Sequence, residues 1–422
     1  MTEAGVVERA VRFALSAVGA RQLEARPADR FYEAPADIPD RPGELLKAEP
    51  GRFYIDPFRL VPAPARVERI MFTTTDRLGS TIPVTGTVMT PTRPRTKRDD
   101  RGLVAFAVGT QGMGTQCAPS RQMAAGREYE SVFITGLLAR GYNVVVPDYQ
   151  GLGMRAAGQR THTYMSRQVQ GHVVLDALRA AQSLSNPDIP LDGPTAIAGY
   201  SQGGGAAASA AEIAHEYAPD LDVRGAVCGA VPADFPLVAR MLDGSPYFAF
   251  LGYALVGLSS DYGIDLRPLL NERGVEVATA LSDQCMFESL RRYAFTRSNT
   301  LTADGRSIGS MLREEPFATI VAEQKLGDGR YPRTEALVSH SRLDDVVPFE
   351  CGRALAERWA GQGARVRFSV NVAPTHAAAA LTSYGTAFAF LNGRFAGRPM
   401  RANTKRYLHG LVQDQAEQAE PT

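Results

Sequence analysis

Residues 195–205 read TAIAGYSQGGG, and three alanines follow them. An apolar run of strand length, residues 195–200, leads directly into Ser201, and the small residues after it are compatible with a helix. This order matches the strand, sharp turn and helix in which a G-x-S-x-G sequence exposes its serine. The turn strains the serine backbone, so Gly199 and Gly203 must both be small. We therefore interpret Ser201 as a nucleophile; the alternative is an idle serine in a glycine-rich turn.

Short apolar runs alternate with helical patterns from about residue 100 onward, which predicts a mostly parallel sheet flanked by helices. Together with the turn at Ser201, this alternation indicates an α/β-hydrolase fold. The expected strands are residues 103–108, 142–146, 195–200, 223–231, 335–339 and 366–372. The expected helices include 166–183, 203–217, 349–360 and 377–391. An antiparallel strand pair, 67–76 and 81–89, is expected at the sheet edge.

The alternation is interrupted between about residues 233 and 330, a gap too long for a structureless loop in a compact domain. Its first part is rich in aromatic residues, glycine and proline, so we expect an inserted helical subdomain. The expected units are an N-terminal helix and wrapping arm at 1–50, a core at 51–232 and 329–400, an inserted cap at 233–328 and a polar tail at 401–422.

A serine hydroxyl needs a base to take its proton, and the base needs an acid to orient it. In this fold they follow the chain order serine, acid, histidine. Of the six histidines, His376 follows an expected strand, where catalytic groups gather in open α/β sheets. We expect His376 to be the base, with His340 as the alternative. The acid is expected in the turn after the strand at 335–339, where Asp344 and Asp345 compete.

The oxyanion of such a reaction is stabilised by fixed hydrogen-bond donors. The first expected donor is the backbone N–H of Gln202, the residue after the nucleophile. The second is expected from residues 109–116, the loop after the strand at 103–108, which reads GTQGMGTQ. Its glycines lack the G-x-G-x-x-G order and no G-K-[ST] follows, so nucleotide binding is not expected.

The charges of the chain nearly cancel, with 46 Lys and Arg against 45 Asp and Glu. No basic excess is available for a phosphate backbone, so nucleic acid is not an expected partner. No apolar stretch approaches the roughly 20 residues that span a bilayer, so no transmembrane segment is expected. The four cysteines form no C-x-x-C, so no metal site is expected. Residues 13–20 make a poor signal peptide, and an amphipathic helix over 6–23 explains them at least as well.

Several motifs point to one family when they are taken together. They are GYSQG at 199–203, CAPS at 117–120, PDYQG at 147–151, DDVVP at 344–348 and the stretch 225–232 that leads into the insertion. In combination they resemble the secreted lipase family that includes lipase A of Candida antarctica. The resemblance extends over roughly residues 45–395, and it is much more specific than G-x-S-x-G alone.

The resemblance implies hydrolysis of carboxylic esters, triacylglycerols included, without a metal or another cofactor. It places the catalytic triad on Ser201, Asp344 and His376, which favours Asp344 over Asp345. It also implies that residues 233–328 form a lid that shapes an acyl-chain tunnel.

The resemblance further implies a disulfide and an oxyanion contact. A family disulfide falls on Cys117 and Cys285, which leaves Cys228 and Cys351 as free, buried thiols. Where the family has an acidic residue just before the first of these cysteines, this chain has Gln116. An amide donates a hydrogen bond at any pH, whereas a carboxyl must first be protonated. We therefore hypothesise that Gln116 supplies the second oxyanion contact.

Substrate and compartment are the least determined properties. A lipase is the leading interpretation; the alternatives are a short-chain carboxylesterase, an acyltransferase with the same triad, and a non-catalytic binding protein. Phe235, Phe248 and Phe250 of the insertion are candidates to line the acyl chain, or they form its core. The resemblance and the cysteine pair favour a secreted or cell-envelope protein, whereas the poor signal peptide makes the cytoplasm the alternative. The oligomeric state is not predicted.

Overall fold

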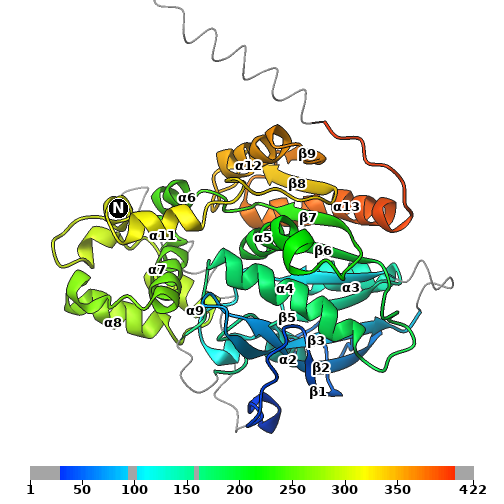
Figure 1. The fold of residues 1–422 in the computed structure, drawn as a ribbon. Helices are drawn as coiled ribbons and strands as arrows, with labels where there is room; N and C mark the ends of the chain where they lie inside the picture. Colours follow the sequence, from blue (N-terminus) through cyan, green and yellow to red (C-terminus); the bar gives the residue numbers. More distant parts are fainter. Residues whose placement is uncertain (1–28, 94–101, 156–160, 404–422) are drawn as a thin grey trace, which may run out of the picture.

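The structure, a computed structural model, describes residues 29–93, 102–155 and 161–403. In these ranges one nine-stranded sheet forms the centre, with the strand order β1-β2-β3-β5-β4-β6-β7-β8-β9 (Figure 1). The strands are β1 Leu45–Pro50, β2 Ala65–Thr75, β3 Thr81–Pro91, β4 Leu103–Ala107, β5 Asn143–Pro147, β6 Thr195–Tyr200, β7 Val223–Gly229, β8 Ala336–Ser341 and β9 Val366–Asn371.

The sheet has an antiparallel part and a parallel part. The ladders β1–β2, β2–β3 and β3–β5 are antiparallel, and every ladder from β5 through β4 to β9 is parallel. Every residue of β4, β5 and β6 is buried, as expected for parallel strands covered on both faces. The carboxyl ends of these strands therefore meet at one edge of the sheet, where the loops that carry function gather.

Helices cover both faces of the sheet. On one face lie α4 (Arg167–Gln182), α5 (Gln202–Tyr217) and α12 (Phe349–Gly361), the last tied to α5 by a hydrogen bond from the Trp359 indole to Glu212. On the other face lie α3 (Ser131–Ala139) and α13 (His376–Phe395), where the rings of Phe133 and Phe388 stack with centroids 4.8 Å apart. The short helix α2 (Pro119–Ala125) packs near β3 and β5.

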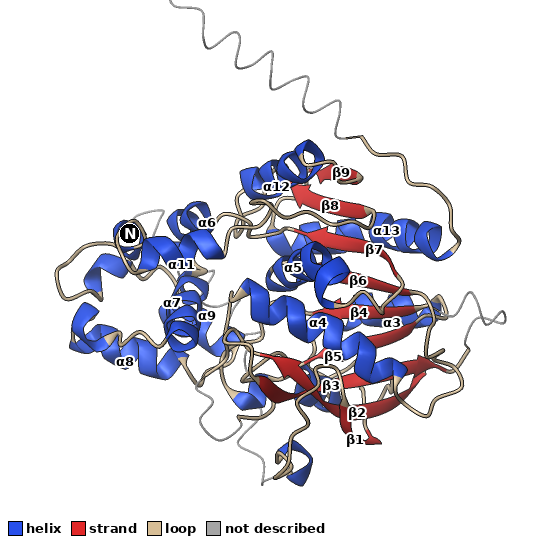
Figure 2. Ribbon diagram, viewed as in Figure 1, coloured by secondary structure: helices blue, strands red, loops and turns tan. Residues whose placement is uncertain are grey.

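Between β7 and β8 the chain forms a helical insertion, residues 235–323, beside the sheet (Figure 2). Its helices are α6 Phe235–Leu242, α7 Phe248–Tyr262, α8 Glu272–Leu281, α9 Met286–Tyr293, α10 Ile308–Met311 and α11 Phe317–Glu323. The insertion has its own apolar cluster, separate from that of the sheet. A disulfide between Cys117 and Cys285 joins it to the loop before α2, whereas Cys228 and Cys351 are free and buried.

The expected strands and helices of the parallel part are all present, with ends that differ by a few residues at most. The expected antiparallel strand pair is present as β2 and β3, but its expected place at the edge of the sheet is wrong. Residues 45–50, expected in a wrapping arm, form β1, which pairs with β2 and displaces the strand pair from the edge. As the edge strand, β1 pairs on one side only. Its sequence, LLKAEP, is half exposed and shows no clear alternation of apolar and polar residues. The helix expected over 6–23 and most of the tail at 401–422 lie outside the described residues.

Candidate active site

Ser201 lies at the turn between β6 and α5, with φ +60° and ψ −122°. This backbone conformation is rare for a residue with a side chain and costs of the order of 1–3 kcal/mol. It lifts the serine out of the strand direction at the carboxyl end of β6. A strained serine at a strand-to-helix turn is the geometry that G-x-S-x-G sequences adopt when the hydroxyl is a nucleophile.

Two glycines make this turn possible. A Cβ on Gly199 would overlap with the carbonyl of Gly203, and a Cβ on Gly203 would overlap with the carbonyl of Ala107 in β4. Both contacts are with backbone atoms, which cannot move aside without disturbing α5 or β4. The requirement for small residues on both sides of Ser201 thus has a direct steric cause.

Asp344 and His376 lie after β8 and β9 and form a close pair. The imidazole Nδ1 of His376 lies 2.9 and 2.8 Å from the two carboxylate oxygens of Asp344. The carboxylate also accepts the backbone N–H groups of Val346 and Val347, at 3.0 and 2.8 Å. Burial raises the pKa of Asp344, but the hydrogen bond and charge of His376 and these N–H groups together hold it below its ordinary value. Asp344 is therefore an ionised acceptor that fixes the ring.

Asp345 has different partners from its neighbour. One carboxylate oxygen accepts the backbone N–H of His376 at 2.7 Å, and the other accepts the hydroxyl of Tyr247 at 2.9 Å. Asp345 therefore holds the start of α13 and contacts the helical insertion, while Asp344 alone faces the imidazole. The sequence pattern left the two aspartates in competition, and this difference in partners separates them.

The ring of His376 is held at the end of β6. The hydroxyl of Tyr200, the residue before Ser201, donates to the His376 carbonyl at 2.9 Å, and the two ring centroids are 4.9 Å apart. His340, the alternative base, is buried and its Nε2 lies 3.0 Å from the carbonyl of Val347. His376 is the histidine that contacts both the acid and the strand carrying the serine.

On the other side of β6, the side chain of Gln202 meets a second histidine. Its Nε2 lies 3.0 Å from Nε2 of His162, whose Nδ1 lies 2.7 Å from the carbonyl of Gln150. A carbonyl only accepts, so Nδ1 carries the proton and Nε2 accepts the amide N–H of Gln202. Burial lowers the pKa of His162 to about 4, which keeps the ring neutral in this arrangement.

Two buried carboxyl groups accept hydrogen bonds from the loop after β4. Glu130 accepts the backbone N–H of Gly109, and Glu128 accepts the side-chain amide of Gln111 at 3.2 Å. Burial raises the pKa of Glu128 to about 7 and that of Glu130 well above its ordinary value. Sequence reasoning missed this pair and the role of His162, because their partners lie on other loops.

Gln116 takes a different direction from the other expected site residues. Its side-chain amide donates to the carbonyl of Asp283 in the helical insertion, at 2.5 Å. Ser201, Gln202, Asp344 and His376 gather at the carboxyl edge of the sheet, whereas Gln116 is engaged with the insertion.

The three expected aromatic residues of the insertion are buried within it. Phe235 lines a small apolar cavity with residues of α7, α10 and α11. The rings of Phe250 and Tyr247 are parallel, with centroids 6.0 Å apart. Because the Tyr247 hydroxyl donates to Asp345, the residue before the helix that carries Phe248 and Phe250 contacts the neighbour of Asp344.

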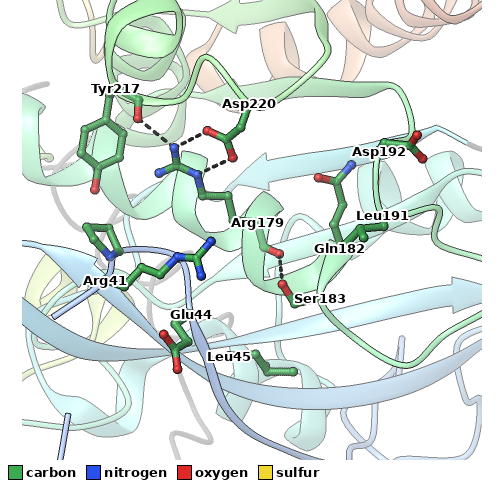
Figure 3. A pocket seen from close by; sticks show the side chains of 12 residues that line it. Arg41, Glu44, Leu45, Arg179, Gln182, Ser183, Leu191, Asp192, Tyr217 and Asp220 are labelled. Carbon is green, nitrogen blue, oxygen red and sulfur yellow. Dashed lines mark hydrogen bonds and ion pairs between the residues drawn. The ribbon is translucent and has the colours of Figure 1, made fainter. Parts of the chain in front are cut away.

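A larger groove, about 740 Å³, lies away from these residues (Figure 3). It is lined by Leu191 and Asp220, which precede β6 and β7, so it lies toward the amino ends of strands whose carboxyl ends carry the site. Its Arg179 is already paired with Asp220 and with the carbonyl of Tyr217. None of the residues that line this groove belongs to the expected triad.

Two further properties concern the described ranges only. Within them, no group of three or more His, Cys, Asp and Glu is arranged to hold a metal ion. No helix in those ranges is long and apolar enough to cross a bilayer.

The chain is similar to known proteins in sequence and in fold. The model of the secretory lipase family matches residues 118–403. The chain belongs to the secretory lipase family. It is a carboxylic-ester hydrolase with the α/β-hydrolase fold. A secreted triacylglycerol lipase of Malassezia globosa is 27% identical over 389 residues, which cover 88% of this chain and 79% of that one.

Other similar proteins differ in the activity that their descriptions give. A probable inactive lipase of Mycobacterium tuberculosis is 26% identical over 392 residues, covering 88% and 83% of the two chains. Candida antarctica lipase A in its closed state superposes with a TM-score of 0.76 at 22% identity, covering 89% and 87%. A rice cell wall degrading esterase of Xanthomonas oryzae superposes with a TM-score of 0.70 at 19% identity, covering 86% and 100%. These structural likenesses establish the fold alone.

Proposed function

We propose that this secretory lipase family member hydrolyses water-insoluble carboxylic esters, triacylglycerols among them, through Ser201, His376 and Asp344. The observation that carries the proposal is the Asp344–His376 pair at the end of the strand that leads into the strained serine. A carboxylate on Nδ1 leaves Nε2 free to accept a proton from the serine hydroxyl.

The proposed reaction has two halves. In the first, the Ser201 oxygen attacks the ester carbonyl while His376 Nε2 takes the hydroxyl proton. The imidazolium, stabilised by Asp344, then gives this proton to the leaving alcohol, and the acyl group stays on Ser201. In the second half, His376 takes a proton from water, whose oxygen attacks the acyl-enzyme. Return of that proton to Ser201 releases the carboxylic acid and restores the enzyme.

The oxyanion is proposed to be stabilised by the backbone N–H of Gln202, at the start of α5, where the helix dipole adds to its effect. For the second contact with the oxyanion we propose the side-chain amide of Gln116. Its amide now donates to Asp283, so this role requires that turnover exchange the contact with the insertion for one with the oxyanion. His162 is proposed as a positioning residue, because it holds the side chain of Gln202.

We further propose that residues 233–328 act as a lid and that the apolar interior of the insertion receives the acyl chain. Phe235 lines a small apolar cavity there, about 10 Å³, which an acyl chain can enter only when the surrounding helices move apart. Phe248 and Phe250 are the nearby candidates. The insertion contacts the rest of the chain at several points, among them the Cys117–Cys285 disulfide and the hydrogen bonds of Tyr247 to Asp345 and of Gln116 to Asp283. The Tyr247–Asp345 hydrogen bond can break without a covalent change, and Asp345 is the neighbour of Asp344.

A secreted or cell-envelope location is part of the proposal. The disulfide supports it, since such bonds persist in oxidising compartments. Several relatives, including those of Malassezia, are described as secreted. Blocking of free thiols in protein taken from its native compartment and denatured without reductant, followed by mass measurement, would test it: two modified cysteines support the location, and four contradict it.

The activity is tested with a fluorophosphonate probe and a series of p-nitrophenyl esters of rising chain length, followed by emulsified triacylglycerol. We expect labelling that disappears in Ser201→Ala, with kcat lowered at least about 1,000-fold. Turnover limited to short acyl chains would replace the lipase assignment by a carboxylesterase. Absence of both labelling and turnover in the folded wild type would contradict the proposed function.

A further inference from the structure

The loop of residues 54–62, here called the apolar loop, places large apolar side chains in water. Phe58 is 70% exposed and Leu60 78%, with Val61 at 47% and Ile55 at 41%. The loop is closed by a β-bridge between Tyr54 and Pro62. Single exposed apolar residues are common on protein surfaces, but a contiguous group of large ones indicates an interaction site.

The backbone of the apolar loop is satisfied from within. The Asp56 carboxylate accepts the backbone N–H groups of Phe58, Leu60 and Val61 at 2.9, 2.9 and 2.7 Å. The N–H of Arg59 is bonded to the Asp56 carbonyl at 3.1 Å. Every N–H from Phe58 to Val61 therefore has a partner inside the loop. Such a tip can enter the polar interfacial layer of a lipid surface without unpaired N–H groups, which removes part of the cost of placing irregular backbone there.

The apolar loop is also braced against the body of the protein. The N–H of Tyr54 donates to the carbonyl of Met123 in α2 at 3.0 Å. The carbonyl of Asp56 packs so closely on Gly126 that a Cβ there would overlap with it. The exposed side chains are thus presented by a stiff turn, so that little conformational entropy is lost when they bind.

Two arginines accompany the apolar side chains. Arg59 lies at the tip and Arg52 at the base, and both are exposed. Neither has an ion pair with another residue of the described ranges. Arginines beside an exposed apolar tip are suited to the phosphates of a lipid surface, where the stem packs on the apolar zone and the guanidinium stays at headgroup depth.

We infer that the apolar loop is a lipid anchor, which inserts Phe58 and Leu60 into the interfacial layer of an anionic lipid surface and places Arg52 and Arg59 among its phosphates. The inference rests on the proposed function, because a water-insoluble ester substrate lies in or beside such a surface. It extends that function to a part of the chain outside the insertion. The paired N–H groups of the loop, and two arginines that have no ion pair within the described ranges, favour a lipid surface over a second copy of the chain, which would offer backbone partners of its own.

Binding is measured by sedimentation with vesicles of equimolar phosphatidylcholine and phosphatidylglycerol, in the full chain carrying Ser201→Ala so that no ester is consumed. We expect Phe58→Ser and Leu60→Ser each to lower the partition coefficient about tenfold, since each removes one large apolar side chain from the bound state. Arg52→Gln should lower it about fivefold on these vesicles and leave binding to pure phosphatidylcholine unchanged.

The chain contains a matched control for Leu60. Leu78 is 76% exposed on a turn in which the Asp76 carboxylate likewise accepts two backbone N–H groups, but it has no large apolar neighbour at the tip. Leu78→Ser should change vesicle binding by less than about twofold. Equal losses in Leu60→Ser and Leu78→Ser would overturn the inference. So would a monomer–dimer shift in Leu60→Ser without vesicles, because the occupant would then be a second copy.

Insertion itself is read from Phe58→Trp. The natural Trp359 is fully buried, so a blue shift on vesicle addition reports the new indole, and its absence contradicts insertion. Turnover of soluble p-nitrophenyl butyrate by the enzyme with Ser201 intact separates the two claims. The anchor fails if this turnover is present while vesicle binding is unaffected by Phe58→Ser and Leu60→Ser. The proposed function fails if turnover is absent while the Ser201→Ala protein still binds.

Discussion

The two sides of β6 carry the same residue type in opposite electrostatic settings. On the side of β7 to β9, His376 faces the ionised Asp344 and retains some contact with water. On the side of β4 and β5, His162 is fully buried and faces the neutral carbonyl of Gln150. The group that hydrogen-bonds to Nδ1 therefore determines whether Nε2 can take up a proton or only accept a hydrogen bond.

This difference separates proton transfer from positioning. A carboxylate beside Nδ1 stabilises the imidazolium that forms when Nε2 takes a proton. A carbonyl beside Nδ1 cannot compensate a positive charge inside the protein, so His162 stays neutral and its Nε2 serves as a fixed acceptor for Gln202. We expect changes on the Asp344 side to act mainly on the rate, and changes on the His162 side to act on geometry and on the pH dependence of stability.

The largest expected effect comes from Asp344→Asn. An amide cannot stabilise the imidazolium, and it favours the wrong tautomer of His376, so kcat should fall by about 10⁴. The matched control is Asp345→Asn, which alters the neighbouring carboxylate but keeps an oxygen for the N–H of His376. It should lower kcat less than about tenfold. Initial rates with p-nitrophenyl butyrate measure both, and similar losses in the two variants would remove the distinction between the aspartates.

A smaller effect is expected for Gln116→Ala. If its amide reaches the oxyanion during turnover, kcat should fall about 100-fold at nearly constant KM, the usual loss for one oxyanion donor. Gln122→Ala is the control, because its amide donates to the Gln116 carbonyl without approaching the site. A loss below about tenfold in Gln116→Ala would leave the amide with its present role, a contact to Asp283 of the insertion.

The fold and the strained turn at Ser201 could be predicted because their signals are local. The apolar strand, the glycines and Ser201 are adjacent in the chain, and the alternation of strands and helices is visible without knowledge of contacts. The ordering of Asp344 over Asp345 is not local, since it depends on which carboxylate points at a ring more than thirty positions later. Only the family resemblance favoured Asp344 from the sequence.

What the sequence did not predict is mostly long-range or weakly patterned. His162 contacts a side chain forty positions away, and nothing around it indicates a partner. The edge strand β1 ends in Pro50 and contains a lysine and a glutamate. Such residues prevent a sheet edge from pairing with another chain, and they also make the strand difficult to recognise from its sequence. Glu128 and Glu130 resemble ordinary surface acids, and only their burial gives them a role.

The positioning role of His162 predicts a loss that one substitution reverses. His162→Asn retains a donor for the Gln150 carbonyl but loses the acceptor for Gln202, so kcat should fall about tenfold. His162→Gln is longer and can still accept the Gln202 amide, so it should recover most of the rate. Steady-state kinetics of both variants measure this. Equal rates in the two would mean that the ring only fills space.

The smallest effects are those on stability, and they have opposite signs for His162 and Glu128. His162 has a pKa of about 4 in the fold against 6.5 for an unperturbed histidine. The unfolded chain therefore binds more protons between these values, and this histidine costs stability as the pH falls through them. Glu128 has a pKa of about 7 against 4.5, so here the folded chain binds more protons and stability is lost as the pH rises.

Two single variants should therefore show opposite pH dependences of the free energy of unfolding. Relative to the parent, His162→Gln should gain stability as the pH falls from about 6.5 to 4, and Glu128→Gln should gain it as the pH rises from about 4.5 to 7. Each gain should be roughly 1–3 kcal/mol, because one pKa unit corresponds to about 1.4 kcal/mol. Urea midpoints across this pH range measure both. If both variants gained stability in the same pH direction, or if the gains did not depend on pH, His162 and Glu128 would not be held neutral in the fold. The contrast with the Asp344–His376 side would then disappear.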